Sequence, residues 1–145
     1  KAIGRNVPKV NGAQTITTYR ALYKAIQAGL VASCHDCSDG GLAVALSETA
    51  FAGGMGMNID LNYVPYQGKK RNDYILFSET AGRFIVTIQP TAKYKFEKVM
   101  AGNVISEIGF VTNDGLFQVT GLNGRLIIKE MIGKLKAAWQ KPLNF

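Results

Sequence analysis

Residues 30–42, LVASCHDCSDGGL, change from an apolar run to a polar, glycine-rich loop, and this change is the most informative feature of the sequence. We expect Leu30–Cys34 to form a short buried strand and His35–Gly41 to form the loop. A helix is predicted to begin near Leu42 and to end at Gly53-Gly54, since glycine favours a helix stop. The predicted apolar stripe of this helix consists of Leu42, Leu46 and Ala50.

On both sides of this stretch, apolar residues recur at helical or at strand spacing. We expect an extended lead-in over residues 1–14 and a helix over 18–28. Further elements are expected as strands over 57–61, 74–77, 84–88 and 104–112, a helix from residue 91, a hairpin of 116–120 with 125–128, and a last helix carrying Ile128, Met131, Ile132, Leu135 and Trp139. This uneven alternation indicates an α+β fold with helices packed on a mixed sheet.

The length and composition are those of one folded domain. The chain has 145 residues, of which 47% are hydrophobic and 19% are charged. No charged start leads into a long apolar run, so we expect no signal peptide. No stretch approaches the roughly 20 apolar residues that span a bilayer, so we expect no membrane insertion. The first residue is Lys1 rather than Met, which weakly favours a segment of a longer gene product.

The net charge of +7 favours anionic partners in general. The basic residues are dispersed, however, and the tightest run is Lys69-Lys70-Arg71. A nucleic-acid surface would need clustered bases interleaved with stacking aromatics. We therefore interpret the charge as a solvated basic surface and expect no nucleic-acid partner.

Cys34 and Cys37 have C-x-x-C spacing, which is typical of zinc and redox sites. A structural zinc site needs about four ligands, and the chain has only two Cys and one His. A thioredoxin-like pair would sit at a helix start, whereas the helix here is predicted to begin after two glycines. We expect two reduced, structural thiols.

The loop itself allows two interpretations. Gly40 and Gly41 permit close approach of the backbone to a ligand, and a helix N-terminus favours anions such as phosphate. Asp36 and Asp39 beside it would suit a bridging Mg²⁺, giving a phosphate–Mg²⁺ loop. Alternatively, the loop is only a capped helix start, with Ser38 or Asp39 as the N-cap.

A second constellation, Ser78-Glu79-Thr80 with Arg83, lies in the turn between two predicted strands. Glu79 could bind a metal or accept a hydrogen bond, and Arg83 could hold a phosphate or a carboxylate. The alternative is a Glu79–Arg83 surface pair of small energetic weight. His35 is interpreted as a structural histidine held by hydrogen bonds rather than as an acid–base group.

These motifs resemble a known family. Residues 35–46, HDCSDGGLAVAL, resemble the glycine-rich segment of the second C-terminal-type domain in the phosphoribosylformylglycinamidine synthase family. LFSE at 76–79 with Arg83 resembles the second signature of that family, and VPKV at 7–10 resembles its lead-in. The first motif is shared with a superfamily that includes aminoimidazole ribonucleotide synthetase, selenophosphate synthetase, thiamine-monophosphate kinase and a hydrogenase-maturation protein. Both motifs together point to the formylglycinamidine enzyme.

The resemblance implies that residues 1–145 are a single C-terminal-type domain of a longer, cytoplasmic carbon–nitrogen ligase of purine biosynthesis, inactive alone. It also implies helices on one face of the mixed sheet. That synthetase uses ATP and Mg²⁺ to convert formylglycinamide ribonucleotide to its amidine. Implied partners are the remaining domains of the parent chain and, in the short form, a glutaminase subunit and a small accessory subunit. Alternatives are another member of the superfamily, of the aminoimidazole ribonucleotide synthetase or selenophosphate synthetase type, and a non-catalytic interaction module.

Carried over residue by residue, the resemblance implies binding residues but no catalytic residue. The catalytic histidine of the family lies in another domain type, so His35 is not expected to be that residue. The chain departs from the family after Glu79, where Ala81 cannot hydrogen-bond as the usual Gln would. The implied residues are Asp36, Asp39, Gly40, Gly41 and Ser78 for the nucleotide, Glu79 and Asp36 for the metal, and Arg83 for the substrate.

Overall fold

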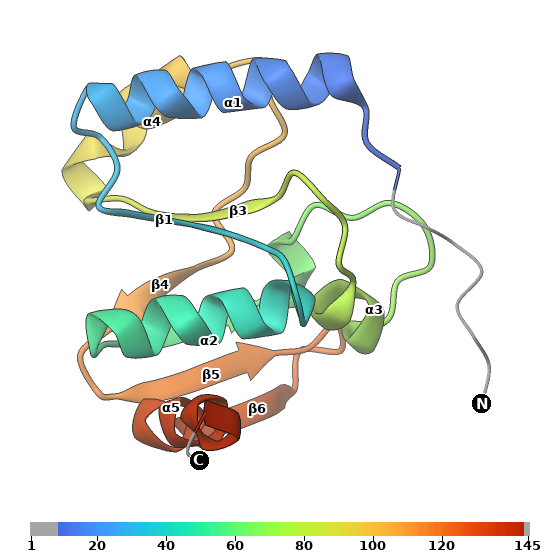
Figure 1. Cartoon of the computed structure of the whole chain (residues 1–145), viewed down its shortest axis with the longest axis vertical. Helices are drawn as coiled ribbons and strands as arrows, with labels where there is room; N and C mark the ends of the chain where they lie inside the picture. The colour runs from blue at the N-terminus through green and yellow to red at the C-terminus, as the bar shows by residue number, and fades with distance from the viewer. Residues whose placement is uncertain (1–8, 144–145) are drawn as a thin grey trace.

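The helix α2 (Gly41–Gly53) runs through the middle of the molecule, between a two-stranded and a four-stranded sheet (Figure 1). This computed structural model describes residues 9–143. The remaining helices are α1 (Gly12–Gln27), α3 (Asn72–Phe77), α4 (Lys93–Val99) and α5 (Ile132–Gln140), with 3-10 turns η1 (Leu61–Tyr63), η2 (Pro90–Ala92) and η3 (Lys141–Leu143).

The two sheets differ in size and direction. The small sheet pairs β1 (Ser33–Asp36) with β3 (Phe84–Thr87) in antiparallel register. The large sheet has the order β4-β2-β5-β6, in which β2 and β5 are parallel and the other pairs antiparallel. Its strands are β2 (Gly56–Asp60), β4 (Gly109–Thr112), β5 (Leu116–Thr120) and β6 (Leu126–Met131). The predicted α+β fold with a mixed sheet is therefore confirmed.

The large sheet has one covered face, as expected. Residues alternate between the faces of a strand, so Phe117 and Val119 of β5 point to α2 and are at most 1% exposed. Phe110 of β4 lies opposite Asn58 of β2 and is 62% exposed. Helices α2 and α5 lie on the buried side, where Leu46 and Leu135 join the same cluster.

The small sheet separates two apolar clusters. Ile85 of β3 points into the cluster around α2. Its neighbours Phe84 and Val86 point the other way, into a second cluster between α1 and α4. Tyr19 of α1 lies edge-on to Phe84, with ring centroids 5.2 Å apart. The alternation of β3 thus joins the α1 layer to the α2 layer.

Several predicted boundaries are wrong. Residues 74–77 were expected as a strand but belong to α3, because a four-residue apolar run fits a buried helix turn equally well. Asp73 in the first turn of α3, paired with Arg71 at 2.6 Å, favours the helix. The strand expected over 30–34 is β1, shifted to Ser33–Asp36.

The ends of other elements also differ from expectation. Helix α1 begins at Gly12, inside the predicted lead-in, because Asn11 caps it by accepting from the Gln14 N–H at 3.2 Å. The lead-in residues 1–8 lie outside the described part. The strand expected over 104–112 is only β4, and Ile128 and Met131 lie in β6 rather than in the last helix. Among the helices of residues 9–143, none is both long enough and apolar enough to cross a membrane.

Candidate functional site

The loop after β1 and the turn before β3 meet at the start of α2. The Cys37 N–H donates to the Arg83 carbonyl at 2.9 Å, which extends the β1–β3 pairing into the loop. The Gly40 N–H donates to the Glu79 carboxylate at 2.9 Å. The two signatures, about 40 residues apart in sequence, therefore form one site.

The glycine pair is required by the fold of this site. Gly40 has φ 78° and Gly41 has φ 65°, which side chains rarely adopt. A Cβ at Gly41 would lie 2.5 Å from the Ser78 carbonyl oxygen, and a Cβ at Gly40 would lie 2.3 Å from the Val44 side chain. The glycines therefore let the turn approach the helix start.

The predicted side-chain cap is wrong. The N-cap of α2 is Gly40, which has no side chain, and within residues 9–143 no side-chain cap hydrogen bond is formed there. The Gly41 N–H donates to the Ser38 carbonyl at 2.9 Å, so Ser38 acts through its backbone. The Glu79 carboxylate accepts from the N-cap Gly40, and the helix dipole at this point favours a further anion on the N–H groups of the first turn. The interpretation as a phosphate–Mg²⁺ loop remains a prediction.

The turn Ser78–Arg83 is held by its own arginine. Arg83 donates to the carbonyl oxygens of Ser78 and, at 3.3 Å, of Thr80. The Ser78 and Thr80 hydroxyls lie 2.9 Å apart. The alternative Glu79–Arg83 pair is absent from the ion pairs of residues 9–143, because Glu79 turns to Gly40 instead. Ala81 is exposed, and its methyl group offers no hydrogen bond.

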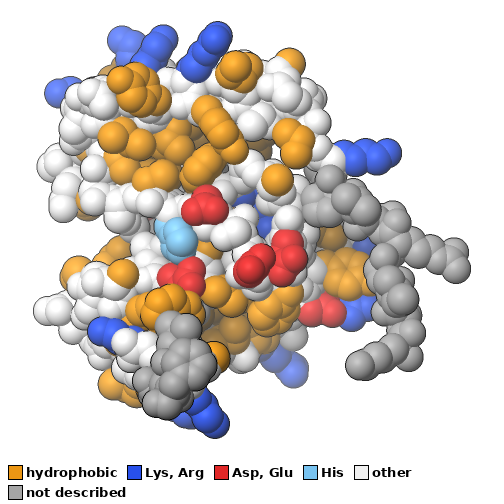
Figure 2. Space-filling view, in the orientation of Figure 1, with side chains coloured by type: hydrophobic (Ala, Val, Ile, Leu, Met, Phe, Trp, Pro, Cys, Tyr) orange, Lys and Arg blue, Asp and Glu red, His pale blue; other side chains and the backbone are white. Residues whose placement is uncertain are grey.

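Acidic side chains gather around this helix start. Figure 2 shows them in red in the middle of one face, beside the single histidine in pale blue. Asp36 has a side chain that is 63% exposed, and Asp39 and Glu79 are also exposed. Within residues 9–143 no group of three or more His, Cys, Asp and Glu residues has the arrangement of a metal site. These carboxylates are hard oxygen ligands of the kind Mg²⁺ prefers, but they do not complete its coordination.

His35 has the structural role expected of it. Its Nε2 lies 2.7 Å from Oε2 of Glu48 on α2. The other Glu48 oxygen accepts from the Trp139 indole N–H at 2.6 Å. Neither Glu48 nor Trp139 was expected from the sequence as part of this site. The available signal for Glu48 was that it is the one charged residue of its helix.

Cys34 and Cys37 are both free thiols, as expected, with Cys34 exposed and Cys37 buried. Burial raises the pKa of Cys37, an effect partly offset by the nearby Arg83 guanidinium. Partial burial and then the charge of Asp36 raise the pKa of Cys34. Raised pKa values disfavour the reactive thiolate, which argues against redox chemistry at this pair.

The chain is similar in sequence to subunits of phosphoribosylformylglycinamidine synthase. The profile of the family described as AIR synthase related protein, C-terminal domain, matches residues 2–121. The phosphoribosylformylglycinamidine synthase subunit PurL of Limosilactobacillus reuteri is 41% identical over 122 residues, covering 84% of this chain and 15% of that protein. The PurL of Alkaliphilus metalliredigens is 35% identical over 140 residues, covering 95% of this chain and 18% of that protein. The chain thus spans less than a fifth of these relatives.

Solved structures share the fold. The Thermotoga maritima PurL complexed with FGAR superposes with a TM-score of 0.82 at 21% identity, over 93% of this chain and 23% of that chain. The hydrogenase maturation protein HypE superposes with a TM-score of 0.66 at 19% identity, over 79% of this chain and 41% of that one. The resemblance drawn from the two motifs is confirmed: the chain belongs to the family of AIR synthase related proteins, C-terminal domain.

Proposed function

We propose that this chain is one domain of an ATP-dependent synthetase of the PurL type, which converts formylglycinamide ribonucleotide to the amidine. The observation that carries the proposal is the contact between the two signatures, where Glu79 meets Gly40 at 2.9 Å. The names of the relatives support it, and solved PurL structures are described as complexes with FGAR and with ATP. The proposed partners are the rest of the parent chain and, in a short form, a glutaminase subunit and a small accessory subunit. The proposed location is the cytoplasm.

In this proposal the start of α2 binds the nucleotide phosphates. The Gly40 and Gly41 backbone provides close approach, and the helix dipole favours negative charge. Asp36 and Asp39 flank this point, and Ser78 offers a partly exposed hydroxyl beside it.

Asp36 and Glu79 would supply hard oxygen ligands to Mg²⁺, together with ligands from outside this chain. The ion, when bound, neutralises charge on the transferred phosphoryl group. Arg83 is assigned to the substrate. Its guanidinium is already bound to two carbonyl oxygens, so it would act from a fixed position.

The test is ADP release by the full-length parent with Mg-ATP and ammonium, with and without formylglycinamide ribonucleotide. We expect release to depend on the ribonucleotide. Glu79→Gln should lower turnover about tenfold to a hundredfold while the Gln oxygen still accepts from Gly40. Asp36→Asn should act in the same direction. Glu97→Gln, an exposed carboxylate on α4, is the matched control and should leave turnover unchanged.

Each alternative predicts a different result. Release without any dependence on the ribonucleotide, by a folded parent that binds ATP, would assign the chain to another member of the superfamily. Full activity of both site variants, with unchanged thermal unfolding, would favour the non-catalytic interaction module.

A further inference from the structure

The single histidine and the single tryptophan of the chain share one carboxylate. Glu48 lies on α2, and its two oxygens contact His35 Nε2 at 2.7 Å and the Trp139 N–H at 2.6 Å. His35 lies on β1 and Trp139 on α5, 104 residues apart in sequence (139 − 35). One side chain therefore ties three elements together.

This contact supports the strand from which the loop begins. On one edge β1 is paired with β3, where His35 lies opposite Ile85. Toward α2, the His35 ring is held by Glu48, and the next residue, Asp36, is the last of β1. The side chains of His35 and Glu48 are only 34% and 25% exposed, so solvent screens their contact less than that of a surface pair.

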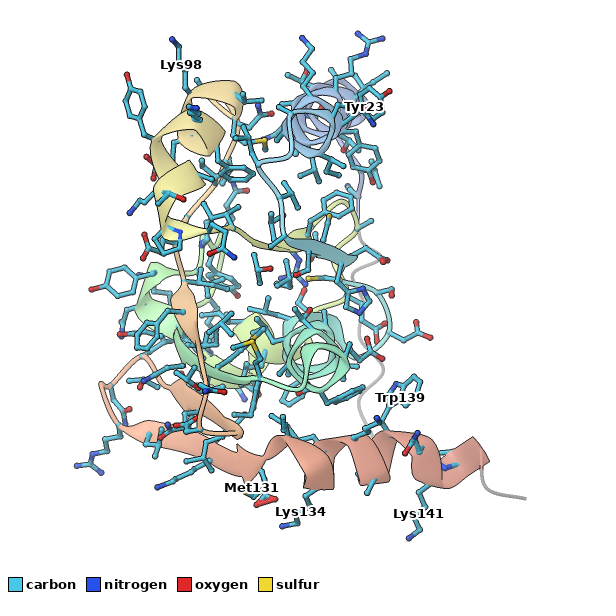
Figure 3. All side chains as sticks on the ribbon, turned by 90° about the vertical axis from the view of Figure 1, so that its left-hand side faces the viewer. Tyr23, Lys98, Met131, Lys134, Trp139 and Lys141 are labelled. Carbon is cyan, nitrogen blue, oxygen red and sulfur yellow. The ribbon has the colours of Figure 1, made fainter. Side chains whose placement is uncertain are left out.

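Trp139 in turn fixes Glu48. Its ring packs on Phe51 of α2, with ring centroids 5.6 Å apart, at a small groove of about 220 Å³. In Figure 3, Trp139 points from α5 toward α2, whereas Lys134 and Lys141 point to the opposite side. A free glutamate would sample several rotamers, so the indole donor of Trp139, a residue 47% exposed, reduces the freedom of the carboxylate that holds His35.

We propose that Glu48 and Trp139 are positioning residues for the loop Cys37–Gly40. Helix α5, which carries Trp139, lies beyond residues 2–121, the part that the family profile matches. The proposed support of the loop therefore comes in part from outside the matched region. That the loop binds nucleotide rests on the function proposed above, whereas the coupling from Trp139 to the loop does not.

Amide hydrogen exchange of this chain, measured without nucleotide, tests the coupling. Gly40 and Gly41 report on the loop, because both N–H groups are hydrogen-bonded and so protected. Trp139→Phe keeps an aromatic ring but removes the indole N–H donor, and it should raise the exchange rate at both glycines about threefold to tenfold. Glu48→Gln retains an acceptor for the indole and a donor for the imidazole, so it should change exchange by less than about twofold.

The readout is the ratio of loop exchange to exchange at Leu22 and Ala25, which are buried in α1 and outside the coupled elements. Lys134→Ala, on the exposed side of α5, is the matched control and should leave the ratio unchanged. A raised ratio in Trp139→Phe, little changed in Glu48→Gln, supports the proposal.

An unchanged ratio, with faster exchange in α5 alone, would overturn the proposal by making Trp139 a helix anchor only. If Trp139→Phe unfolds, the same ratio measured in Glu48→Leu tests the proposal instead. This variant removes both acceptor oxygens and puts an apolar side chain of similar size in their place. Since no nucleotide is present, either result leaves the test of the synthetase independent.

Discussion

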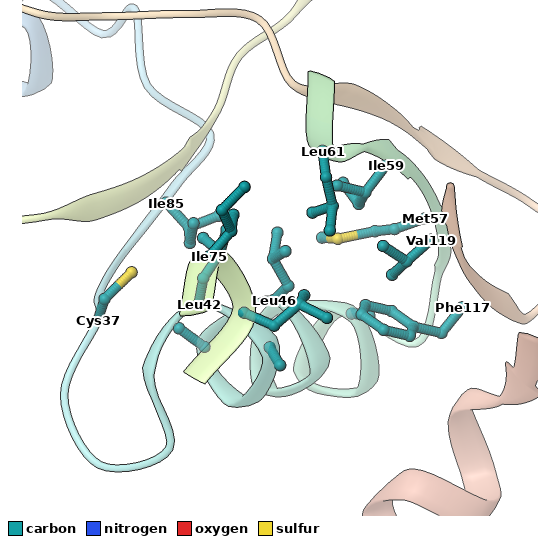
Figure 4. Packing of buried hydrophobic residues seen from close by; sticks show 14 residues of the cluster. Cys37, Leu42, Leu46, Met57, Ile59, Leu61, Ile75, Ile85, Phe117 and Val119 are labelled. Atoms are coloured by element: carbon teal, nitrogen blue, oxygen red, sulfur yellow. The ribbon is translucent and has the colours of Figure 1, made fainter. Parts of the chain in front are cut away.

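The layer around α2 and the layer around α1 are built to different depths. Among the described residues, the α2 cluster contains fourteen buried residues, most of them from the two sheets, α2 and α3 (Figure 4). The cluster under α1 contains four, namely Leu22, Ala25, Phe96 and Met100. The candidate site lies at the rim of the deeper cluster, so its loop is anchored on the better-packed part of the molecule.

One face of α1 is apolar but exposed, and it shows the same contrast. Apolar residues at positions 16, 19, 23 and 26 follow helical spacing, yet they are between 44% and 63% exposed. Helix α2, in contrast, buries Leu42, Leu46 and Ala50 almost completely. Less burial means less hydrophobic stabilisation, so the α1 layer should open at a lower free energy than the α2 layer.

The same substitution made in each of the two clusters tests this difference in burial most directly. Leu46, 1% exposed, lies between Leu42 and Phe117 at the centre of the α2 cluster (Figure 4). Leu46→Ala should lower the free energy of unfolding by about 3–5 kcal/mol, because the surroundings cannot collapse onto the cavity. Leu22→Ala, in the thinner cluster, should cost about 2 kcal/mol. Urea unfolding measures both values, and equal losses would contradict the proposed difference in depth.

A glycine substitution tests how tightly the site is joined to the deeper layer. Gly41→Ala should cost about 2–3 kcal/mol, because it combines a positive φ with a Cβ placed 2.5 Å from the Ser78 carbonyl oxygen. Gly54, at the other end of α2, has φ 68° but nothing within 4 Å, so Gly54→Ala should cost only about 1 kcal/mol. Thermal unfolding of both variants gives the comparison. Equal costs would mean that the turn moves away from Gly41 without strain.

The sequence predicted most elements of the deeper layer well, because local signals and burial agree there; the exception is α3, which was expected as a strand. Strand β2, the β5–β6 hairpin and the stop of α2 at Gly53-Gly54 lie close to where periodicity and glycines placed them. It failed where tertiary pairing sets the boundary. The register of β1 depends on its pairing with β3, in which Ser33 lies opposite Thr87, 54 residues later in the chain. No local sequence pattern indicates that pairing.

The candidate site was predicted only in part, because local residue types indicate its motifs but not the contacts between distant segments. The two signatures, with Asp36, Gly40 and Glu79 among them, were identified from their residue types, and the structure brings them together at the start of α2. Neither the Glu48 contacts nor the carbonyl partners of Arg83 could be predicted, because they depend on three-dimensional packing between distant segments. The glycine pair was assigned to ligand approach, whereas the structure also requires Gly41 for packing against Ser78 and Gly40 for packing against Val44.

The smallest expected effect concerns the two cysteines at the junction of the layers. Cys37 faces the α2 cluster, and burial raises its pKa, so the folded state binds the thiol proton more tightly than the unfolded state does. The stability this contributes is complete below the unfolded pKa of about 8.5 and is lost as pH rises through the folded pKa. Cys37→Ala should therefore flatten the fall in stability above that pH, measured by urea unfolding across pH 8 to 10.

Thiol labelling at neutral pH compares the accessibility of the two cysteines. Exposed Cys34 should react with a disulfide reagent in the native protein, though slowly, because its pKa is also raised. Buried Cys37 should react only after opening of the α2 cluster, so the Cys34→Ala protein should label about as slowly as that cluster opens. Leu46→Ala should accelerate this labelling and Leu22→Ala should not. If Cys37 labels as fast as Cys34, the loop opens independently of the core, and the anchoring argued from the packing is wrong.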